Sequence, residues 1–358
     1  MAVLHKALAE AGGWWPFDRY MALALYTPDL GYYSGPAVKF GALPASGSDF
    51  VTAPELSPWF GRTLGRQVAQ ALRATDTDTV WEFGAGTGAL AEEVLTQLAA
   101  DGLRPRYRIV DLSGSLRARQ QARLQAFASQ VDWVDALPER FAGVLLGNEV
   151  LDAMPVQLLA RKAGVWHERG VALGPDGALA WVDRPTDLRP PVDVQGEHDY
   201  LTEIHPQAEA FVRTLAERWT AGAAFFIDYG FPEAEYYHPQ RHMGTLTGHR
   251  AHQRDDAVLQ YLGEMDITAH VNFTGVALAA QDAGLQVMGY TSQGRFLLNA
   301  GLLDLAHDAP LAERTQLTRL VHEHEMGELF KVLVLAPAAS AEGWLPSGLA
   351  TGDRTHTL

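Results

Sequence analysis

Residues 79 to 90 read Thr-Val-Trp-Glu-Phe-Gly-Ala-Gly-Thr-Gly-Ala-Leu, and this stretch decides the fold. The β-branched and aromatic side chains of residues 80 to 83 predict a buried strand, and the alanines and leucines of residues 89 to 98 recur at helical spacing. Three glycines stand between the two: Gly84, Gly86 and Gly88. Because glycine has no Cβ, such a strand-to-helix turn can be sharp, and a ligand can approach the N–H groups at the helix start. The turn therefore predicts a small bound cofactor.

Two cofactors fit this turn. The spacing Gly84-x-Gly86-x-x-Ala89 satisfies the G-x-G-x-x-G/A fingerprint of dinucleotide-binding proteins, so an NAD(P)-dependent oxidoreductase is one alternative. Glu82 favours S-adenosylmethionine (SAM) instead, because a carboxylate at the strand end repels a pyrophosphate and attracts the ammonium of an aminoacyl ligand. Gly88, a third glycine two positions after the second, also favours SAM. A structural turn without a ligand is the remaining interpretation.

The composition narrows the class of protein. The chain has 358 residues with 28 basic and 43 acidic side chains, and its formal charge of −15 opposes binding to a phosphate backbone, so nucleic acid is not an expected partner. It contains no cysteine, and its 13 histidines show no metal-binding spacing, so neither disulfides nor a metal are expected. We find no apolar stretch long enough to span a bilayer and no export signal, which predicts a cytoplasmic protein without a membrane span.

Strands and helices alternate from residue 80 onward, which predicts a parallel sheet with crossover helices. The expected helices cover residues 2 to 11, 17 to 26, 54 to 74, 115 to 127, 205 to 219 and 273 to 283, with more helix between 295 and 325. The expected core strands cover residues 80 to 83, 106 to 110, 131 to 134, 143 to 146, 223 to 229, 285 to 290 and 330 to 336. Shorter strands at 156 to 159, 165 to 173 and 178 to 182 predict an antiparallel meander, and residues 232 to 256 are predicted to form a long loop.

Together these elements predict an α/β fold with a Rossmann-like sheet, an N-terminal helical cap, and inserted antiparallel β and helical segments. The helical cap and lid take residues 1 to 75, and the core takes residues 76 to 155 and 220 to 338. The inserted β-meander and its connecting helix take residues 156 to 219. Residues 339 to 358 are expected to form a C-terminal tail.

Polar residues follow the core strands, at the edge where a doubly wound sheet binds its ligands. Asp111 is expected to accept hydrogen bonds from both ribose hydroxyls, because a carboxylate offers two acceptor oxygens. Asp135 and Ala136 are expected to meet an adenine edge, whereas Asn148 and Glu149 would flank the reacting centre. The predicted cofactor-binding residues are Glu82, Gly84, Ala85, Gly86, Gly88, Asp111, Leu112, Asp135, Ala136 and Asn148.

Glu149 and Asp152 lie three residues apart in the segment Asn148-Glu-Val-Leu-Asp-Ala-Met-Pro155. If this segment is a helical turn, both carboxylates share a face and make a paired-carboxylate site. A capped surface turn is the alternative, since Asp and Asn are common turn formers and helix caps.

Several further segments resemble those of a known family. They are Gly31-Tyr-Tyr-Ser34, residues 49 to 57, Leu116-Arg-Ala-Arg-Gln120, Gly147-Asn-Glu-Val-Leu-Asp-Ala-Met-Pro-Val156, Ile227-Asp-Tyr-Gly230, Asp266-Ile-Thr-Ala-His-Val-Asn-Phe273, Gln293-Gly-Arg-Phe-Leu297 and Gly327-Glu-Leu-Phe-Lys331. With these and the glycine turn, nearly the whole chain resembles the MidA-like family of SAM-dependent methyltransferases. Asp111 stands where the family often has Glu, Asn272 where it often has Asp, and Gly248-His249 replaces an aromatic-containing turn.

The resemblance implies a class I SAM-dependent methyltransferase sheet with SAM as cofactor. Mitochondrial members assist assembly of respiratory complex I by methylating an arginine of one subunit, so the implied partner is a protein substrate bearing an arginine. The implied catalytic residues, which would hold the guanidinium and take up its proton, are Glu149, Asp152 and Asp228. Those implied to contact substrate or form a lid are Tyr32, Tyr33, Glu55, Tyr229 and His270. A non-catalytic assembly factor with the same fold stays an alternative function. The oligomeric state is left open, with a homodimer as one alternative.

Overall fold

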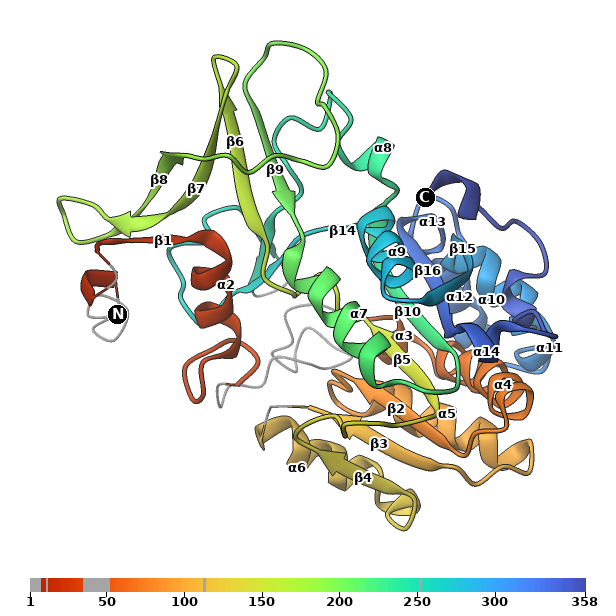
Figure 1. The fold of residues 1–358 in the computed structure, drawn as a ribbon. Coiled ribbons are helices and arrows are strands. Elements are labelled where there is room, and N and C mark those ends of the chain that lie inside the picture. The colour runs from red at the N-terminus through yellow and green to blue at the C-terminus, as the bar shows by residue number, and fades with distance from the viewer. Residues whose placement is uncertain (1–7, 11, 35–51, 112–113, 251–252) are drawn as a thin grey trace.

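The computed structural model describes residues 8–10, 12–34, 52–111, 114–250 and 253–358. In these ranges the strands form three sheets: a central sheet of eight strands, a second sheet of five and a small sheet of three. Figure 1 shows the central sheet between helices in the lower half of the view, with the five-stranded sheet above it, beside the N-terminal helix α2 (Phe17–Tyr26). A helix-covered core and a β-rich part packed over one end of it thus make up the molecule.

The central sheet has the strand order β15-β16-β10-β5-β2-β3-β4, and β14 (Val271–Asn272) pairs beside β10. Its other members are β2 (Thr79–Phe83), β3 (Arg106–Val110), β4 (Val131–Val134), β5 (Val144–Asn148), β10 (Ala224–Phe231), β15 (Leu285–Ser292) and β16 (Phe330–Pro337). The strands β4, β3, β2, β5 and β10 run parallel, whereas β16 runs antiparallel to both of its neighbours. This arrangement confirms the predicted Rossmann-like α/β sheet.

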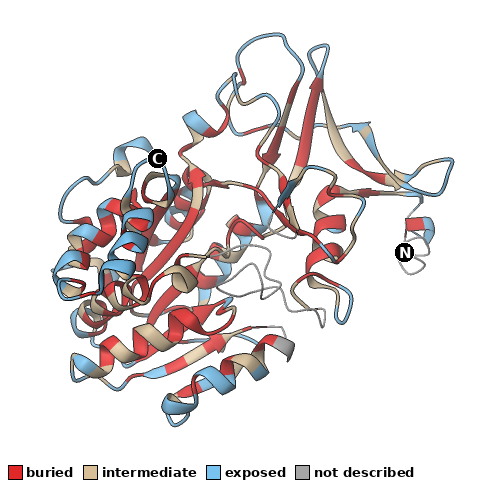
Figure 2. Ribbon diagram, turned by 180° about the vertical axis from the view of Figure 1, so that it is seen from behind, coloured by how far each residue is buried: buried red, intermediate tan, exposed pale blue. Residues whose placement is uncertain are grey.

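The two faces of the central sheet carry separate hydrophobic clusters, because neighbouring residues of a strand point to opposite faces. Val80 and Phe225 belong to one cluster, whereas the residues that follow them, Trp81 and Phe226, belong to the other. The first cluster includes side chains of α4 (Pro58–Thr75) and α5 (Ala89–Ala100), and the second includes those of α7 (Pro206–Arg218) and α9 (Phe273–Asp282). Figure 2 shows the resulting pattern, with buried strands between helices that are exposed on their outer sides.

One predicted helix is divided in two. The helix expected over residues 54 to 74 consists of α3 (Ala53–Leu56) and α4, separated by Ser57 with extended backbone (φ −155°, ψ 133°). The ring of Pro58 disfavours helical backbone at the preceding residue, so the first helix ends there. The Ser57 hydroxyl then caps α4 by accepting a hydrogen bond from the N–H of Trp59. The helix predicted over residues 2 to 11 lies mostly outside the described residues.

Shorter helices complete the core. They are α6 (Gly114–Arg123), α8 (Glu233–Tyr236), α10 (Gln293–Asn299), α11 (Leu302–Leu305), α12 (Leu311–Val321), α13 (Met326–Leu329) and α14 (Ala338–Ala341), with 3₁₀ turns at Gln125–Phe127, Ser347–Leu349 and Thr355–Thr357. The predicted C-terminal tail returns to β15, the edge strand of the central sheet. There the N–H of Tyr290 donates to Asp353 at 3.0 Å, and the N–H of Arg354 donates to the carbonyl of Tyr290 at 2.6 Å. The tail thereby covers an exposed sheet edge.

The five-stranded sheet contains the predicted meander, which the strands β6 (Gln157–Lys162), β7 (Val165–Leu173) and β8 (Leu179–Pro185) confirm. Two of its strands were not predicted: β9 (Tyr200–Ile204), which pairs with β6, and β1 (Trp14–Pro16), which pairs with β7. Phe17 and Tyr20 of the cap pack in one cluster with Leu158 of the meander. The cap and the meander, which the sequence assigns to separate regions, thus share one sheet and one core.

The loop predicted over residues 232 to 256 is more regular than expected. It contains α8 and the strands β11 (Thr247–Arg250) and β12 (Gln253–Asp255), which join β13 (Asp266–Thr268) in the small antiparallel sheet. These strands have few apolar residues, so their sequence carries no strand pattern.

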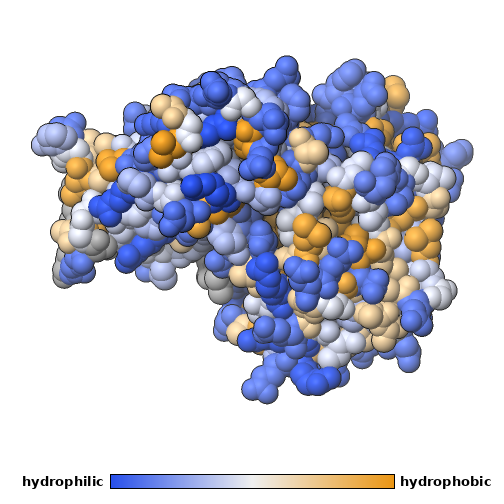
Figure 3. Space-filling model, turned by 45° about the horizontal axis from the view of Figure 1, so that its top comes forward, coloured by the Kyte–Doolittle hydropathy of each residue, from blue (hydrophilic) through white to orange (hydrophobic). Residues whose placement is uncertain are grey.

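The described part of the chain contains no helix long and apolar enough to cross a membrane. Figure 3 shows one face of the molecule, mostly hydrophilic, with hydrophobic side chains in groups between hydrophilic ones.

Candidate active site

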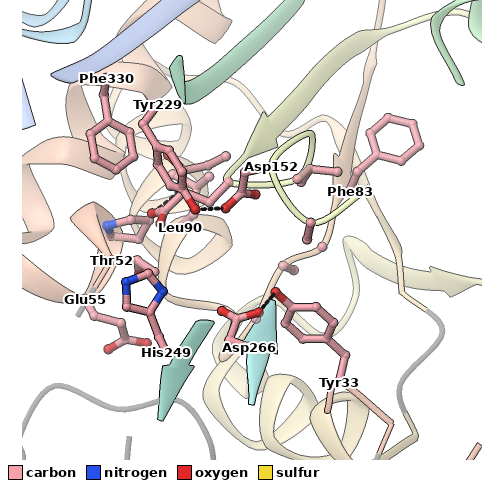
Figure 4. A pocket seen from close by; sticks show the side chains of 18 of the residues that line it. Tyr33, Thr52, Glu55, Phe83, Leu90, Asp152, Tyr229, His249, Asp266 and Phe330 are labelled. Atoms are coloured by element: carbon pink, nitrogen blue, oxygen red, sulfur yellow. Dashed lines mark hydrogen bonds between the residues drawn. The ribbon is translucent and has the colours of Figure 1, made fainter. Parts of the chain in front are cut away.

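A cavity of about 760 Å³ lies beyond the carboxyl ends of β2, β3, β5 and β10 (Figure 4). Its volume falls in the range of about 300–1,000 Å³ that is typical of small-ligand sites. One part is lined by the glycine turn, the ends of β2 and β3, and residues of the segment 52 to 55. The other part is lined by the loop after β5, by Tyr229, and by residues between 241 and 270. Residues from the whole length of the chain thus meet at the edge where a doubly wound sheet binds ligands.

The glycine turn forms one wall of this cavity. Gly84 and Gly86 line it with positive φ angles of 63° and 53°, together with Ala85 between them. A residue with a Cβ costs about 1–2 kcal/mol in this left-handed region, which explains the glycines. A Cβ placed on Gly86 would meet no atom within 4 Å, so the space in front of it belongs to the cavity. Gly88, with φ 85°, is instead the N-cap of α5.

Glu82 brings a buried carboxyl group to the same wall. The side chain is 2% exposed and accepts a hydrogen bond of 2.7 Å from the hydroxyl of Tyr107. Burial raises the pKa of Glu82 to about 7, while the Tyr107 hydrogen bond lowers it and the charge of Asp111 raises it further. A cationic group beside Glu82 would stabilise its ionised form, so this position suits the ammonium of an aminoacyl ligand.

Asp111 lines the cavity at the end of β3 and is held by Gln120. The side-chain amide of Gln120 donates to Asp111 Oδ2 at 2.8 Å and to the carbonyl of Gly86 at 2.9 Å, while its oxygen accepts from the indole of Trp133 at 2.8 Å. Gln120 therefore fixes the carboxylate relative to the glycine turn. In the sequence, the only signal for this role of Gln120 was its place in the family-like motif of residues 116 to 120.

The structure does not bring the proposed adenine contacts to the cavity. The side chain of Asp135 is 83% exposed, pairs with Arg117 at 2.5 Å, and is not among the residues that line the cavity. Ala136 is exposed as well and is likewise absent from the lining. Leu112 lies outside the described residues. The reason is that β4 is the last strand of the sheet, so an acid after it has solvent on its outer side.

The loop after β5 is wrapped around Asp228. This conformation is neither the helical turn nor the capped surface turn that the sequence of the loop suggested. Oδ2 of Asp228 accepts hydrogen bonds from three consecutive N–H groups, those of Val150 at 3.1 Å, Leu151 at 3.0 Å and Asp152 at 3.2 Å. Glu149 begins this loop with a φ of 54°, unusual for a residue with a Cβ. Asp228 itself does not appear in the cavity lining, whereas Asn148, Glu149 and Asp152 do. The structure therefore places Asp228 as the support of the loop, and not, as predicted, against the guanidinium.

Two carboxyl groups of the cavity are each oriented by a tyrosine (Figure 4). Tyr229 donates its hydroxyl to Asp152, and Tyr33 donates its hydroxyl to Oδ1 of Asp266 at 2.7 Å. Both carboxylates are nearly inaccessible to solvent, at 5% and 2% exposed. Asp266 and Tyr33 come from segments 233 residues apart, so the fold alone unites them. The sequence prediction missed Asp266, although it begins the family-like segment 266 to 273.

Burial is the main cause that raises the pKa of these acids. Burial, followed by the charge of Asp152, raises the pKa of Glu149 to about 8. Burial also raises the pKa of Asp152 to about 6, although its hydrogen bond from Tyr229 lowers it. A desolvated cluster of carboxyl groups holds protons until a cation replaces them. The cluster is therefore suited to a positively charged ligand.

The wall of the cavity also carries buried polar atoms that have no hydrogen-bond partner among the described residues. They are Oδ1 of Asn148, Oδ1 of Asp152, Oγ1 of Thr247 and Nδ1 of His270. Burial, and then the charges of Arg241, Lys331 and Arg254, lower the pKa of His270 to about 4, so its ring is neutral at pH 7. Two of these atoms, Oδ1 of Asn148 and, when its carboxyl group is ionised, Oδ1 of Asp152, can only accept hydrogen bonds, and buried acceptors without donors are costly.

The remaining predicted residues are divided between cavity and core. His270 lines the cavity, with its ring 5.1 Å from that of Tyr229. Glu55 lines it too, accepting hydrogen bonds from the hydroxyl of Thr87 and from Arg123 at 3.1 Å. Tyr32, by contrast, is 1% exposed in the cluster of the cap and is absent from the lining. Residues of the lining that the sequence did not suggest include Tyr26, Arg241, His249, Asp266, Arg254 and Arg319.

Comparison with known proteins gives consistent matches. Residues 63–291 match a family described as "Putative S-adenosyl-L-methionine-dependent methyltransferase". The chain is 50% identical to a Burkholderia thailandensis protein whose crystal structure contains S-adenosyl-homocysteine, with a TM-score of 0.95 over 100% of this chain and 96% of that one. A native crystal structure of a protein from the same organism is 49% identical, with a TM-score of 0.91.

Curated relatives are more distant but match over most of their length. The protein arginine methyltransferase NDUFAF7, mitochondrial, of Danio rerio is 29% identical, over 87% of this chain and 81% of the relative. The Homo sapiens protein of the same name is 27% identical, over 90% of this chain and 80% of the relative.

Proposed function

Because the chain belongs to the MidA-like family of SAM-dependent methyltransferases, we propose that it methylates an arginine side chain of a protein. The central sheet is the predicted class I methyltransferase sheet, and SAM is the cofactor. When bound, SAM supplies a methyl group whose bond to sulfur breaks as the bond to the acceptor nitrogen forms, leaving S-adenosyl-homocysteine.

The cofactor part of the cavity fits SAM. Glu82 offers a desolvated carboxyl group for the ammonium, and the turn of Gly84 and Gly86 leaves its backbone open to the ligand. Asp111, oriented by Gln120, offers acceptor oxygens for the ribose hydroxyls. We assign Glu82, Asp111 and residues 84 to 86 to SAM on these grounds.

The observation that carries the arginine assignment is the excess of acceptors in the other part of the cavity. Glu149, Asp152 and Asp266 line it, and Asn148 and Asp152 each carry a buried acceptor oxygen that finds no hydrogen-bond partner in the described ranges. A guanidinium has five N–H donors and no acceptor, so it satisfies such a wall better than any other side chain. A lysine ammonium would offer three donors and a hydroxyl only one.

Two of the acids hold the guanidinium in place. Asp152 and Asp266 are fixed by Tyr229 and Tyr33, so their oxygens are oriented before the acceptor arrives. Such preorganisation matters because the attacking nitrogen must stand about 3–3.5 Å from the methyl carbon, in line with the breaking bond. Asp228 contributes indirectly, by holding the backbone of residues 150 to 152.

Glu149 takes up the proton that the nitrogen loses. A guanidinium has a reference pKa of about 12.5 or more, so methylation requires that one N–H proton leaves. The pKa of Glu149, raised to about 8, makes its carboxylate a better proton acceptor than an ordinary glutamate. The cation of the acceptor displaces the proton held by the empty cluster, and the ionised carboxylate then accepts the proton released during transfer.

The printed names of the relatives support a protein acceptor, since they are called protein arginine methyltransferases. The resemblance in the sequence further suggests a subunit of respiratory complex I as that acceptor. A cytoplasmic location remains part of the proposal.

Isotope-labelled SAM and a host extract test the proposal. The purified protein is incubated with both, and labelled products are identified by mass spectrometry. We expect label on an arginine of one protein, and none with Glu149→Gln, which must still bind S-adenosyl-homocysteine. The exposed Glu139→Gln is the matched control and should retain the labelling. Label in a small molecule, or on another type of side chain, would contradict the proposal.

A further inference from the structure

A second hollow adjoins the acid-lined part of the cavity. It has a volume of about 410 Å³ and shares Arg241 and Gly244 with the main cavity. Its remaining lining consists of Glu235, His238, Gln240 and Met243. The side chain of Met243 is 70% exposed, so this hollow lies at the surface. An acceptor polypeptide that inserts its arginine into the cavity has room to continue here.

Arg241, at the junction of the two hollows, is held in a fixed orientation. Its guanidinium carbon lies 3.9 Å from the ring centroid of Phe231, and its Nε donates to the carbonyl of Glu235 at 3.2 Å. The two terminal nitrogens have no hydrogen-bond partner among the residues that the structure describes. A guanidinium anchored by a ring and one carbonyl, with its outer pair of nitrogens uncommitted, has the geometry that binds a carboxylate with two hydrogen bonds.

The other arginines of the cavity lining differ from Arg241 in this respect. Arg254 pairs with Asp256 at 3.0 Å, and Arg319 pairs with Glu325 at 3.1 Å. Arg241 forms no ion pair with a carboxylate in the described ranges, although the chain carries a formal charge of −15. An uncommitted arginine at a cavity mouth of such an acidic protein points to an anionic group supplied by the ligand.

A continuous wall of rings connects Arg241 to the acid cluster. The ring of Phe231 lies 5.1 Å from that of His270, which lies 5.1 Å from that of Tyr229. The hydroxyl of Tyr229 donates to Asp152. An arginine bound at Asp152 therefore lies along the same wall as Arg241, so one short polypeptide can reach both positions.

We propose that Arg241 binds an Asp or Glu side chain of the acceptor protein, close in sequence to the arginine that is methylated. This inference rests on the proposed function and deepens it, because it names a class of acceptor: an arginine with an acidic neighbour. The acid cluster recognises the target cation, and Arg241 recognises the anion beside it. Acceptors with a basic neighbour are disfavoured, since a second cation would stand against Arg241.

Peptide pairs test this assignment. An array of arginine peptides, each made with Glu or Gln at one of the positions within four residues of the arginine, is assayed with labelled SAM. The wild-type protein should methylate at least one Glu peptide with a kcat/KM about tenfold above that of its Gln partner, through a lower KM. Arg241→Ala should remove this preference and leave the affinity for S-adenosyl-homocysteine unchanged. Arg213→Ala should keep the preference for Glu peptides, because it changes an exposed arginine of α7 that is absent from the cavity lining.

A charge reversal separates recognition from loss of structure. Arg241→Glu should prefer peptides with Lys at the position where the wild-type protein prefers Glu, and a misfolded protein cannot show a reversed preference. Equal methylation of Glu and Gln peptides by the wild-type protein, or an unchanged preference in Arg241→Ala, would overturn the inference alone. If the wild-type protein binds S-adenosyl-homocysteine but labels no arginine in peptides or extract, the proposed function fails and this inference with it.

Discussion

The hydroxyl of Tyr33 donates a hydrogen bond of 2.7 Å to Oδ1 of Asp266. This contact connects the N-terminal cap to the small sheet, across 233 residues of sequence, directly at the cavity wall. Burial, followed by the charge of Asp266, raises the pKa of Tyr33 well above its usual range, so the hydroxyl stays protonated and remains a donor. The cap therefore takes part in the site by orienting one of its carboxylates.

We expect Tyr33→Phe to impair use of the acceptor and not of the cofactor. Loss of a hydrogen bond to a charged group is worth about 1.5–3 kcal/mol, so kcat/KM for the acceptor should fall at least about tenfold. The affinity for S-adenosyl-homocysteine, measured by calorimetry, should stay the same. Tyr290→Phe is the matched control, because the hydroxyl of Tyr290 is buried without a partner among the described residues. A weaker affinity for S-adenosyl-homocysteine in Tyr33→Phe would contradict the assigned role.

The pKa of Glu149 predicts how stability varies with pH. Its value of about 8 in the folded protein, against 4.5 ordinarily, means that the folded protein binds more protons than the unfolded chain between these values. The contribution of Glu149 to the free energy of unfolding must then fall as the pH rises through this window. In the absence of substrate, we expect the melting temperature of the wild-type protein, relative to that of Glu149→Gln, whose amide does not titrate, to decrease between about pH 5 and pH 8.

The control for this experiment is Glu139→Gln, which changes an exposed glutamate and should keep the wild-type slope. Glu82 also has a raised pKa and contributes to the slope in all three proteins. Identical slopes in Glu149→Gln and the wild-type protein would show that Glu149 titrates at its ordinary value.

Local patterns predicted the frame of the molecule, because each depends on residues close in sequence. The glycine turn and the strand-end acids Glu82 and Asp111 could be found this way, since the carboxyl ends of parallel strands meet at one edge. The hydrogen-bond partner of a side chain could not be predicted from such local patterns. Asp228 and Glu149 are both expected near the ends of strands. Asp228, which lies within β10, faces backbone N–H groups, whereas Glu149, which follows β5, faces the cavity, because the loop after β5 takes a left-handed turn at Glu149. The pairing of Tyr33 with Asp266 has no local signal at all.

Glu203 provides a further test, because it supports the cavity from β9 of the five-stranded sheet. Its carboxylate is inaccessible to solvent and accepts hydrogen bonds from the N–H groups of Thr245 at 2.9 Å and Leu246 at 3.0 Å, and from the hydroxyl of Tyr236 at 2.8 Å. The hydroxyl of Thr245 in turn accepts the N–H of His270 at 3.0 Å. Glu203 thus positions residues that line the cavity without lining it itself.

We expect Glu203→Ala to destabilise the protein by about 1–3 kcal/mol for each buried donor left without an acceptor. Glu203→Gln keeps one acceptor oxygen, so its loss should be smaller. Both variants should raise KM for the acceptor more than they lower the affinity for S-adenosyl-homocysteine, a split that general destabilisation would not produce. The exposed Glu217→Gln is the control and should change neither quantity. If affinity for the acceptor and for S-adenosyl-homocysteine fell equally, Glu203 would have only a structural role in the core.

The last prediction separates the conformational role of Gly86 from its contact with the cofactor. Gly86 and Gly102 both have positive φ angles, of 53° and 77°, and a Cβ added to either would meet no atom within 4 Å. Alanine at either position should therefore destabilise the protein by a similar amount, about 1–2 kcal/mol, which is the strain of a Cβ in the left-handed region. Only Gly86 lines the cavity, so only Gly86→Ala should also weaken binding of S-adenosyl-homocysteine, by about tenfold or more. Calorimetric titration of the two variants measures this difference in affinity, and their melting temperatures show whether they are equally destabilised. Equal affinities would mean that the ligand does not approach the backbone at Gly86, and the assignment of residues 84 to 86 to SAM would have to be withdrawn.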